Sequence, residues 1–386
     1  MHALAILAAL VAPALAQETS YVAGLLGVLN AQNLTSLVTV AATLVNNSAG
    51  AALFSQLAQG NKTVFLPNNE AVDKVPQETR RNPALLTSIL TYHVVDGHYN
   101  VSDIAIASNH TILRTFLTNP PLANLENGQG QALVGQRIPG NTPEFIILDT
   151  DETDITRTTS YQNLIIHVVN KVLTPPGSIS QVAELFNLTA LTSALTNVSA
   201  LSTLEATKGV TIFAPRGIDI FTAVQQLGPQ AQNATLISAI LNNHVIKGQT
   251  VYSPAILSSP KNLVSAGGQP FSFITNSSGT FVTSGPATAR IIRTDLLTNN
   301  GVMHVINGVL ANPASNPAPV TPNQSESPAP TKSTTPTAAA QDGGAARAPI
   351  NSGTSITATL PAAVHISVFS AFVAGMCMSY GGGLVL

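Results

Sequence analysis

The spacing of apolar residues predicts that helices come first and strands later, and that this order occurs twice along the chain. Apolar side chains recur at positions i, i+3, i+4 and i+7 from Leu34 to Ala41, which is the spacing of an amphipathic helix. The same pattern starts again at Leu188. Each half of the chain is therefore expected to begin with a helix that presents one apolar face to a core.

Short runs of β-branched and aromatic residues predict strands at equivalent places in the two halves. Residues 64–66 and 210–213 form such runs, and a proline ends each of them, as expected for a strand that leads into a turn. Residues 165–173 and 302–310 are rich in valine and isoleucine, which is typical of a strand that is buried on both faces. We therefore expect each half to close with a buried strand.

Cap and turn residues mark the boundaries of further elements. Asn82 precedes Pro83 at the start of an apolar stripe, which favours a helix with asparagine as its N-cap and proline at its first position. Asn233 stands at the equivalent place in the second half. Residues 271–274 and 280–283 flank the sequence Asn-Ser-Ser-Gly, which predicts a β-hairpin.

Four paired segments in the same order indicate a tandem duplication. The offsets between partners differ only by loop-sized amounts, and the pairs are 33–37 with 187–191, 62–72 with 209–221, 85–104 with 235–256, and 164–176 with 301–313. Because helices come early and strands late in each copy, the expected fold class is α+β, with a β-sandwich and helices packed at one end of it. The expected copies are residues 17–175 and 176–312.

At these segments both copies resemble the fasciclin domain family. Residues 65–72 are similar to the family's first signature, a strand followed by Phe-Ala-Pro-Thr-Asn and a helix, and residues 213–215 keep only its Phe-Ala-Pro. Residues 294–310 are close to the last signature, an aspartate followed by Asn-Gly-Val-Ile-His-Val-Ile, and residues 153–173 resemble it more loosely. The resemblance covers about residues 18–312. It implies tandem fasciclin-like domains, each a small β-sandwich with helices, used in cell adhesion and in matrix or cell-wall association.

The family's middle signature is a helix that ends in Tyr-His, and Tyr92 and His93 keep it. The second copy has Asn243 before His244 instead. The resemblance therefore implies a candidate adhesion surface at Tyr92 and His93, which is better preserved in the first copy than in the second.

Composition limits the expected partners and points to a modified surface. Hydrophobic residues make up 45% of the 386 residues and charged ones 9%, with a net charge of −2. This is a globular composition, and without a basic stripe nucleic acid is not an expected partner. Neutral polar residues, or groups attached to them, must then cover the surface. Such groups are expected at ten Asn-x-Ser/Thr sequons for N-linked glycans, namely Asn33, Asn46, Asn61, Asn100, Asn109, Asn187, Asn197, Asn233, Asn276 and Asn323.

The first residues of the chain predict entry into the secretory pathway. Residues 1–16 contain an apolar run and end in small residues, which predicts a signal peptide that is cut before Gln17. An apolar helix of the mature fold is the alternative interpretation of this segment.

The last residues of the chain predict a lipid anchor. Residues 360–386 contain no Lys, Arg, Asp or Glu, and the small residues Asn351, Ser352 and Gly353 precede them. A small-residue site, a polar spacer and an apolar tail form the signal for a glycosylphosphatidylinositol (GPI) anchor. Attachment is expected at Asn351, or at Ser352 or Gly353, with removal of residues 354–386.

An uncleaved tail anchor is the alternative, as is cleavage near Gly343. Residues 313–353 are rich in proline, serine and threonine, a composition that stays extended because it has too little apolar area to fold. We therefore expect a stalk between the second copy and the anchor. With this stalk and anchor, the architecture looks like that of the secreted fasciclin proteins of fungi.

The histidines that recur in the two copies have two interpretations. His167 and His304 fall on an apolar face of the predicted last strands by period-two counting. His93 and His244 end the equivalent helices. Buried histidines that are hydrogen-bonded to the backbone are the simpler interpretation, and a catalytic site is the alternative.

No residue pattern indicates a metal, a cofactor or an enzyme active site. Asp149, Asp151, Glu152 and Asp154 form the densest acidic cluster, but it lacks the glycine and the distant glutamate of an EF-hand loop, so we expect a solvated loop. The one cysteine, Cys377, lies in the predicted anchor signal, which excludes cysteine-based catalysis in the mature chain. We expect no cofactor and no enzymatic activity.

These expectations together predict a cell-surface adhesion glycoprotein, or one associated with extracellular matrix or cell wall, that presents two domains on a stalk. The expected partner is a cell-surface or matrix protein or a polysaccharide, and the lipid anchor joins the protein to a membrane. The expected location is the outer face of the plasma membrane or the cell wall, with a vacuolar membrane as the alternative. A carrier or sensor of a small apolar ligand or lipid is an alternative function, and so is a hydrolase.

Overall fold

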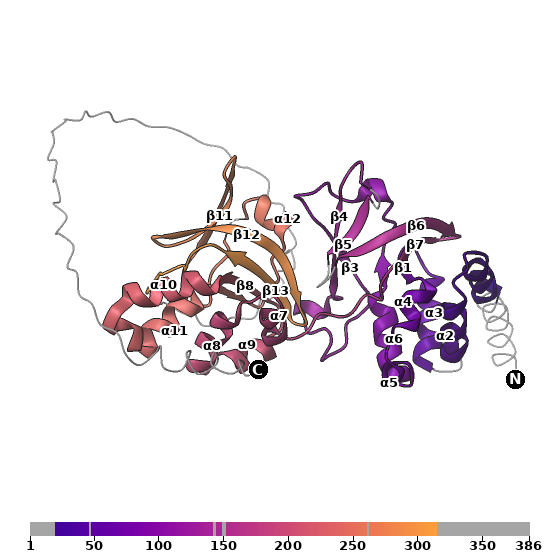
Figure 1. Ribbon diagram of the computed structural model, residues 1–386, viewed down its shortest axis with the longest axis horizontal. Helices are drawn as coiled ribbons and strands as arrows, with labels where there is room; N and C mark the ends of the chain where they lie inside the picture. Colours follow the sequence, from indigo (N-terminus) through magenta and orange to yellow (C-terminus); the bar gives the residue numbers. More distant parts are fainter. Residues whose placement is uncertain (1–19, 46–47, 142–143, 149–151, 261, 315–386) are drawn as a thin grey trace, which may run out of the picture. The chain divides into compact units, whose positions relative to one another are not determined.

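The computed structural model describes residues 20–314, except for 46–47, 142–143, 149–151 and 261. Within this range the chain forms two copies of a mixed helix and strand domain (Figure 1). The predicted signal peptide, the predicted anchor and nearly all of the predicted stalk lie outside the described residues.

The first copy begins with helices and ends with strands, as the apolar pattern predicts. Its helices are Ser20–Ala31, α2 (Thr35–Val45), α3 (Ser48–Leu57), α4 (Asn69–Asp73), α5 (Gln77–Arg80) and α6 (Pro83–Tyr92). Its strands are β1 (Lys62–Pro67), β2 (Val94–Asp96), β3 (Thr111–Arg114), β4 (Ala132–Arg137), β5 (Phe145–Leu148), β6 (Thr153–Tyr161) and β7 (Leu164–Val169). Figure 1 shows α2, α3, α4 and α6 gathered on one side of β1 and β7.

The seven strands of the first copy form one sheet in the order β2-β1-β7-β6-β5-β4-β3. Strands β1 and β7 lie side by side and parallel, with Phe65 opposite His167. The sheet curls, because a bridge between Val95 and Thr115 joins the region of β2 to the end of β3 at the opposite edge. The two layers of the expected sandwich are thus the two halves of one curled sheet.

Alternation along the strands gives each copy two apolar cores. In the first copy Val64 and Ile166 face the helices and pack with Leu25 and Leu37, among others. Phe65, the next residue along β1, belongs to a separate cluster inside the curled sheet. All six residues of β7 are buried, which explains the continuous apolar run in the sequence.

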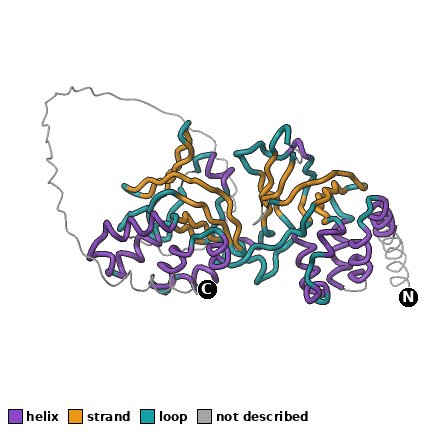
Figure 2. The backbone as a smooth tube through the Cα atoms, in the orientation of Figure 1, coloured by secondary structure: helices purple, strands orange, loops and turns teal. Residues whose placement is uncertain are grey.

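The second copy repeats this plan. Its helices are α7 (Ile179–Leu185), α8 (Thr189–Asn197), α9 (Leu201–Ala206), α10 (Gly217–Leu227), α11 (Ala234–Asn242) and α12 (Ser253–Leu257). Its strands are β8 (Val210–Pro215), β9 (Val245–Lys247), β10 (Phe271–Asn276), β11 (Gly279–Ser284), β12 (Ala287–Thr298) and β13 (Gly301–Ile306). Figure 2 shows the same segregation of helices from strands in both copies.

The six strands of the second copy are ordered β10-β11-β12-β13-β8-β9. Strands β8 and β13 are parallel, with Phe213 opposite His304, so the register equals that of Phe65 and His167 in the first copy. The rings of these pairs stack in both copies, with centroid distances of 5.6 Å and 5.3 Å. The duplication inferred from sequence is therefore a duplication of structure.

The predicted element boundaries hold in most places. Asn82 caps α6 by accepting the Leu85 N–H at 3.1 Å, and Asn233 caps α11 through the N–H groups of Thr235 and Leu236. The predicted hairpin is the pair β10 and β11. The closing strands end at Val169 and Ile306, four residues earlier than the apolar runs predict.

No single helix among the described residues is long and apolar enough to cross a membrane, although the bent pair Thr35–Leu44 and Ser48–Leu57 together meets the criterion of length and composition.

Candidate functional site

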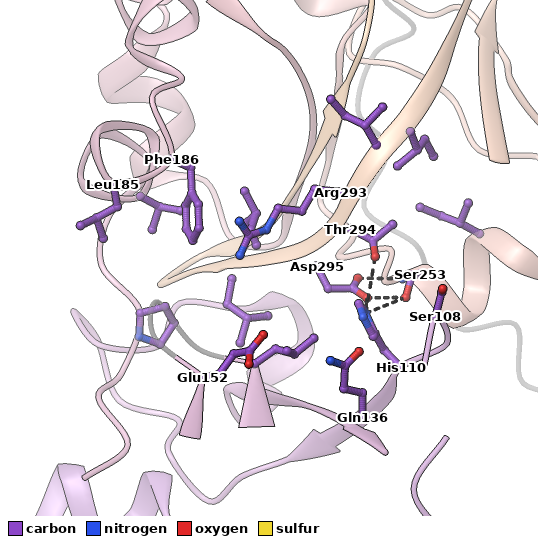
Figure 3. Close-up of a pocket in the computed structure, with 18 of the residues that line it drawn as sticks. Ser108, His110, Gln136, Glu152, Leu185, Phe186, Ser253, Arg293, Thr294 and Asp295 are labelled. Carbon is purple, nitrogen blue, oxygen red and sulfur yellow. Dashed lines mark hydrogen bonds and ion pairs between the residues drawn. The ribbon is translucent and has the colours of Figure 1, made fainter. Parts of the chain in front are cut away.

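A cleft of about 1290 Å³ lies where residues of the two copies meet (Figure 3). Both copies belong to one compact unit of the chain. The first copy contributes His110 and Gln136 to the cleft, and the second contributes Phe186, Arg293 and Asp295. The lining mixes charged, polar and apolar side chains, so the cleft suits a ligand that is both polar and partly apolar.

Asp295 anchors the polar wall of this cleft and is only 5% exposed. It lies where β12 departs from regular pairing, with a positive φ of 59°. Its Oδ1 accepts the backbone N–H of Ser253 at 2.8 Å. Its Oδ2 accepts Nδ1–H of His110 at 2.6 Å and also the hydroxyl of Ser253 (Figure 3). Donors from both copies therefore satisfy one buried carboxylate.

The surroundings of Asp295 keep it ionised. Burial alone would raise its pKa, but hydrogen bonds from His110 and Ser253 and the nearby His304 ring hold the pKa below its usual range. Burial lowers the pKa of His304 itself. The His304 ring accepts the Asp295 N–H at Nδ1 (3.3 Å) and bonds through Nε2 to the Val251 carbonyl (2.8 Å).

Ser253, His110 and Asp295 are the residue types of a hydrolytic triad, but their order differs from that of a triad. In a triad the histidine lies between the carboxylate and the serine and removes the serine proton. Here the carboxylate lies in the middle, and both Ser253 and His110 donate to its Oδ2. The Ser253 hydroxyl thus donates to the carboxylate, with His110 Nδ1 at 3.3 Å from the hydroxyl oxygen, and the cluster joins three segments of the chain in an order that differs from that of a triad.

Arg293 stands on another part of the cleft wall. Its guanidinium lies over the ring of Phe186 at 4.4 Å from the centroid, a cation–π contact. The side chain is exposed and makes no ion pair with any described residue. Figure 3 shows Gln136 and Glu152 of the first copy on the side of the cleft that faces Arg293.

Polar contacts next to the cleft join the two copies. Glu126 of the first copy accepts the backbone N–H of Thr250 at 2.9 Å and its hydroxyl at 2.7 Å. Gly209 makes room for this carboxylate, since a Cβ there would lie 2.4 Å from Glu126 Oε2 and its φ is +65°. Gln131 is fully buried and donates to the Thr298 carbonyl at 3.0 Å.

Apolar packing continues this interface. Ala132 of the first copy packs with Tyr252 and Val302 of the second in one buried cluster. Arg114 lies over the Tyr252 ring at 4.8 Å and donates to its hydroxyl at 3.2 Å. The contact between copies therefore has an apolar centre with polar groups that are hydrogen-bonded, the composition of a specific interface.

The predicted adhesion surface at Tyr92 and His93 is wrong, because each of these residues is only 1% exposed. The Tyr92 hydroxyl donates to the Ala132 carbonyl at 3.0 Å inside the copy. His93 bonds to the Ile89 carbonyl and to the Leu173 N–H. The Tyr-His pair stabilises the core of the domain and is not exposed for contact with a partner.

The replacement at the equivalent position is also structural. Asn243 is fully buried and donates to the carbonyls of Asn312 and Ala314 at 2.8 and 2.7 Å. Its Oδ1 accepts the hydroxyl of Ser265 at 2.6 Å. The Asn243 side chain, which is smaller than tyrosine, thus binds the segment after the last strand. The difference between the copies at this position therefore concerns packing and not an exposed surface.

The structural interpretation of the recurring histidines is confirmed. His93, His167, His244 and His304 are all at most 1% exposed. Each bonds to at least one backbone carbonyl, at 2.7 to 2.8 Å. Burial lowers the pKa of all four.

The sequons remain a prediction, and their exposure is what glycosylation requires. Asn46 and Asn323 lie outside the described residues. The other eight asparagines are exposed: Asn33, Asn61, Asn100, Asn109, Asn187, Asn197, Asn233 and Asn276. Asn33 and Asn187 also have positive φ values of 58° and 56°. Asparagine tolerates this backbone conformation, which is a reason besides glycosylation for asparagine to recur at this position in both copies.

The acidic cluster is only partly described. Asp149 and Asp151 lie outside the described residues, and Glu152 is exposed. Asp154 accepts Nδ2–H of Asn170 at 2.8 Å. In the described part of the chain no three His, Cys, Asp or Glu side chains come together as a metal site would require.

Sequence reasoning missed the cleft. In the sequence Asp295 is only the aspartate of the last fasciclin signature, and His110 is only the middle residue of a sequon. They meet although they lie 185 positions apart in the sequence. No local pattern carries this information, since the contact depends on how the two copies join.

Comparisons with known proteins agree with the fold of the copies. A sequence model of the fasciclin domain matches residues 36–175 and 186–312. A fasciclin-like arabinogalactan protein of Arthroderma benhamiae is 30% identical over 250 residues, which are 64% of this chain and 55% of that protein. Another, of Cercospora beticola, is 24% identical over 263 residues, or 65% of this chain and 67% of that protein. The chain thus spans little more than half the length of the first of these relatives.

A solved structure of a FAS1 domain pair from the insect cell adhesion molecule fasciclin I is also similar. It has 16% sequence identity and a TM-score of 0.33, and the match covers 70% of this chain and 95% of that one.

Proposed function

The chain belongs to the fasciclin domain family, and on that premise we propose that it is a surface glycoprotein that acts in adhesion or in association with a cell wall or matrix. The observation that carries the proposal is that the family match covers both copies. Proteins named fasciclin-like arabinogalactan proteins match over about the same length. The partner we propose is a cell-surface or matrix protein or a polysaccharide.

We further propose that the protein is not an enzyme. The described cluster that comes nearest to a catalytic constellation places Asp295 between His110 and Ser253, so it lacks the order of a hydrolytic triad, in which the histidine lies between the carboxylate and the serine. The recurring histidines are enclosed in the cores, where burial lowers their pKa. These features support a role in binding.

The proposed location is the outer face of the plasma membrane or the cell wall, reached by secretion and held by a GPI anchor. The signal peptide, stalk and anchor signal that the sequence predicts support it, and so does the exposure of the eight described sequon asparagines. A vacuolar membrane is the alternative destination.

The carrier hypothesis receives less support. The cleft between the copies includes Arg293, Glu152 and Asp295 among its lining residues. Desolvating such charged groups against an apolar ligand would cost free energy. The lining therefore favours a polar ligand over a lipid.

Surface display tests the adhesive function. Cells that do not aggregate would express the full chain, and control cells would express a variant that lacks residues 18–312 but keeps the signal peptide, stalk and anchor signal. We expect the full chain to cause aggregation, or binding to isolated cell wall or matrix, because the two domains carry the contact surface. Equal behaviour of the two cell populations would contradict the proposal.

Two enzymatic treatments test the proposed processing. Removal of N-glycans should lower the apparent mass by many kilodaltons, because the sequence holds ten sequons. A phosphatidylinositol-specific phospholipase should release the protein from intact cells if a GPI anchor holds it. An unchanged band would exclude N-glycosylation, and retention on the cells would exclude the GPI anchor in favour of another attachment.

A further inference from the structure

We infer that the cleft between the two copies binds an acidic saccharide, with a sugar carboxylate at Arg293 and sugar hydroxyls at the facing wall. The inference deepens the proposed function, on which it rests, by naming the chemical class of the polysaccharide partner. Three features of the cleft carry it: a cation held in place, a facing row of hydrogen-bond acceptors, and a large volume.

The guanidinium of Arg293 is positioned to bind an anion. Its guanidinium is stacked on Phe186 at 4.4 Å, which restricts the side chain while its N–H groups stay free at the edges of the plane. No described residue forms an ion pair with it. A planar guanidinium of this kind recognises a carboxylate through two parallel hydrogen bonds.

The wall contributed by the first copy offers mainly acceptors. The Glu152 carboxylate is exposed and can only accept. Asp295 accepts from Nδ1–H of His110 at 2.6 Å, and no described residue bonds to the other ring nitrogen, Nε2, which is left for a ligand. Gln136 adds an amide that both donates and accepts. A ligand with hydroxyl groups, such as a sugar, therefore finds hydrogen-bond partners on this wall.

The charges of the lining favour a ligand whose anionic groups are separated by neutral polar groups. Glu152 and Glu184 line the cleft together with Arg290 and Arg293, so a second anionic group opposite Arg293 would meet repulsion. A neutral sugar would provide no anionic group to pair with the Arg293 guanidinium. One carboxylate per sugar unit, with hydroxyls around it, matches the arrangement of cation and acceptors.

The volume of the cleft fits several units of such a chain. Its roughly 1290 Å³ exceeds the 300 to 1,000 Å³ that is usual for small-molecule sites. Phe186 and Leu185 add apolar surface beside Arg293 (Figure 3), against which the C–H face of a sugar ring can pack. The cleft thus provides for the charged, polar and apolar parts of an acidic oligosaccharide.

The test is a titration of the purified full-length protein with trigalacturonic acid and, as a neutral counterpart, with galactotriose. We expect the acidic trisaccharide to bind at least tenfold more tightly, because only it has a carboxylate for Arg293. The Arg293→Gln variant should lose at least tenfold in affinity for the acidic sugar. The Phe186→Leu variant should lose less, since it frees the guanidinium but keeps its charge.

An arginine outside the cleft gives the matched control. Arg81→Gln removes an exposed cation next to α5, and the affinity should not change. The Asn109→Gln variant removes a sequon directly beside His110 and should leave the dependence on Arg293 intact. Circular dichroism of each variant shows whether it remains folded.

The inference is overturned if the neutral sugar binds as tightly, if Arg293→Gln has no effect, or if neither sugar binds at millimolar concentration. Tighter binding of the acidic peptide Glu-Glu-Glu than of trigalacturonic acid would overturn it as well, in favour of a peptide ligand. In the surface display experiment, cells with Arg293→Gln that still adhere would reject the saccharide site but keep the adhesive function. Cells with the unaltered chain that do not adhere would reject the function itself.

Discussion

Two histidines have the same role at the end of equivalent helices. In each copy, Nδ1 of the histidine donates to the carbonyl four residues earlier, and Nε2 accepts a backbone N–H that follows the last strand. For His93 these distances are 2.7 Å to Ile89 and 3.0 Å to Leu173. For His244 they are both 2.8 Å. A proton on Nε2 would face the backbone N–H that this nitrogen now accepts. Both histidines must therefore be neutral in the folded chain.

This geometry predicts a loss of stability in acid. Burial lowers the pKa of His93 and of His244 from 6.5 to about 4. Below pH 6.5 the unfolded chain binds protons that the folded chain cannot, so the free energy of unfolding falls between about pH 6.5 and pH 4 and levels off below. We expect a loss of about 2 kcal/mol per histidine between pH 7.5 and pH 5.

Urea unfolding followed by circular dichroism at several pH values measures this effect, since the chain has no tryptophan. The double variant His93→Gln with His244→Gln should show a flatter dependence on pH, whatever its absolute stability. His98→Gln changes an exposed histidine and serves as the control. An identical pH dependence in the double variant and the unaltered chain would show that these two residues do not carry the effect.

At the scale of helices and strands, the sequence was most informative where an element has a strong local cause. The buried strands β7 and β13 follow from long apolar runs, and α6 and α11 follow from their caps. By contrast, β3 and β5 have only four residues each, which is too few for a period to be recognised. Such strands are stabilised by pairing with a neighbouring strand and by packing on a core, and a local sequence pattern does not show these contacts.

The cap of α11 permits a prediction about one element. Asn233→Ala removes both the oxygen that accepts from Thr235 and Leu236 and the sequon, whereas Asn233→Ser removes the sequon but keeps a capping oxygen. The two variants should therefore differ by about 1 kcal/mol in the free energy of unfolding, with alanine the less stable. Thermal unfolding of the two proteins side by side measures the difference.

A third variant separates the cap from the glycan at this position. Thr235→Ala destroys the sequon and leaves Asn233 in place, so it should resemble Asn233→Ser more than Asn233→Ala. If alanine and serine at position 233 give equal stability, the asparagine contributes nothing as a cap.

At the scale of the whole molecule, the two copies were predictable and their junction was not. The paired segments show the duplication, because each copy repeats its own local patterns. The contact between Gln131 and Thr298 joins residues 167 positions apart, and Gln131 lies outside every repeated segment. The candidate site depends on this junction, which no local motif describes. The local family signature pointed to Tyr92 and His93 instead.

The junction predicts that the two copies unfold together. Separation would expose the buried cluster of Ala132, Tyr252 and Val302 and would leave the carboxylate of Glu126 without its two donors. Unfolding of one copy therefore destabilises the other, and differential scanning calorimetry should show a single transition. Glu126→Ala should weaken this coupling by about 1 to 3 kcal/mol, because two hydrogen bonds to a charged group are lost.

The weakened junction should divide the single transition into two, or broaden it, since each copy has cores of its own. Glu78→Ala removes an exposed carboxylate from α5, away from the junction, and should leave the transition unchanged. Two separate transitions in the unaltered protein would mean that the copies are independent. A cleft formed jointly by independent copies would then lose the fixed spacing between Arg293 and Glu152 on which saccharide binding depends.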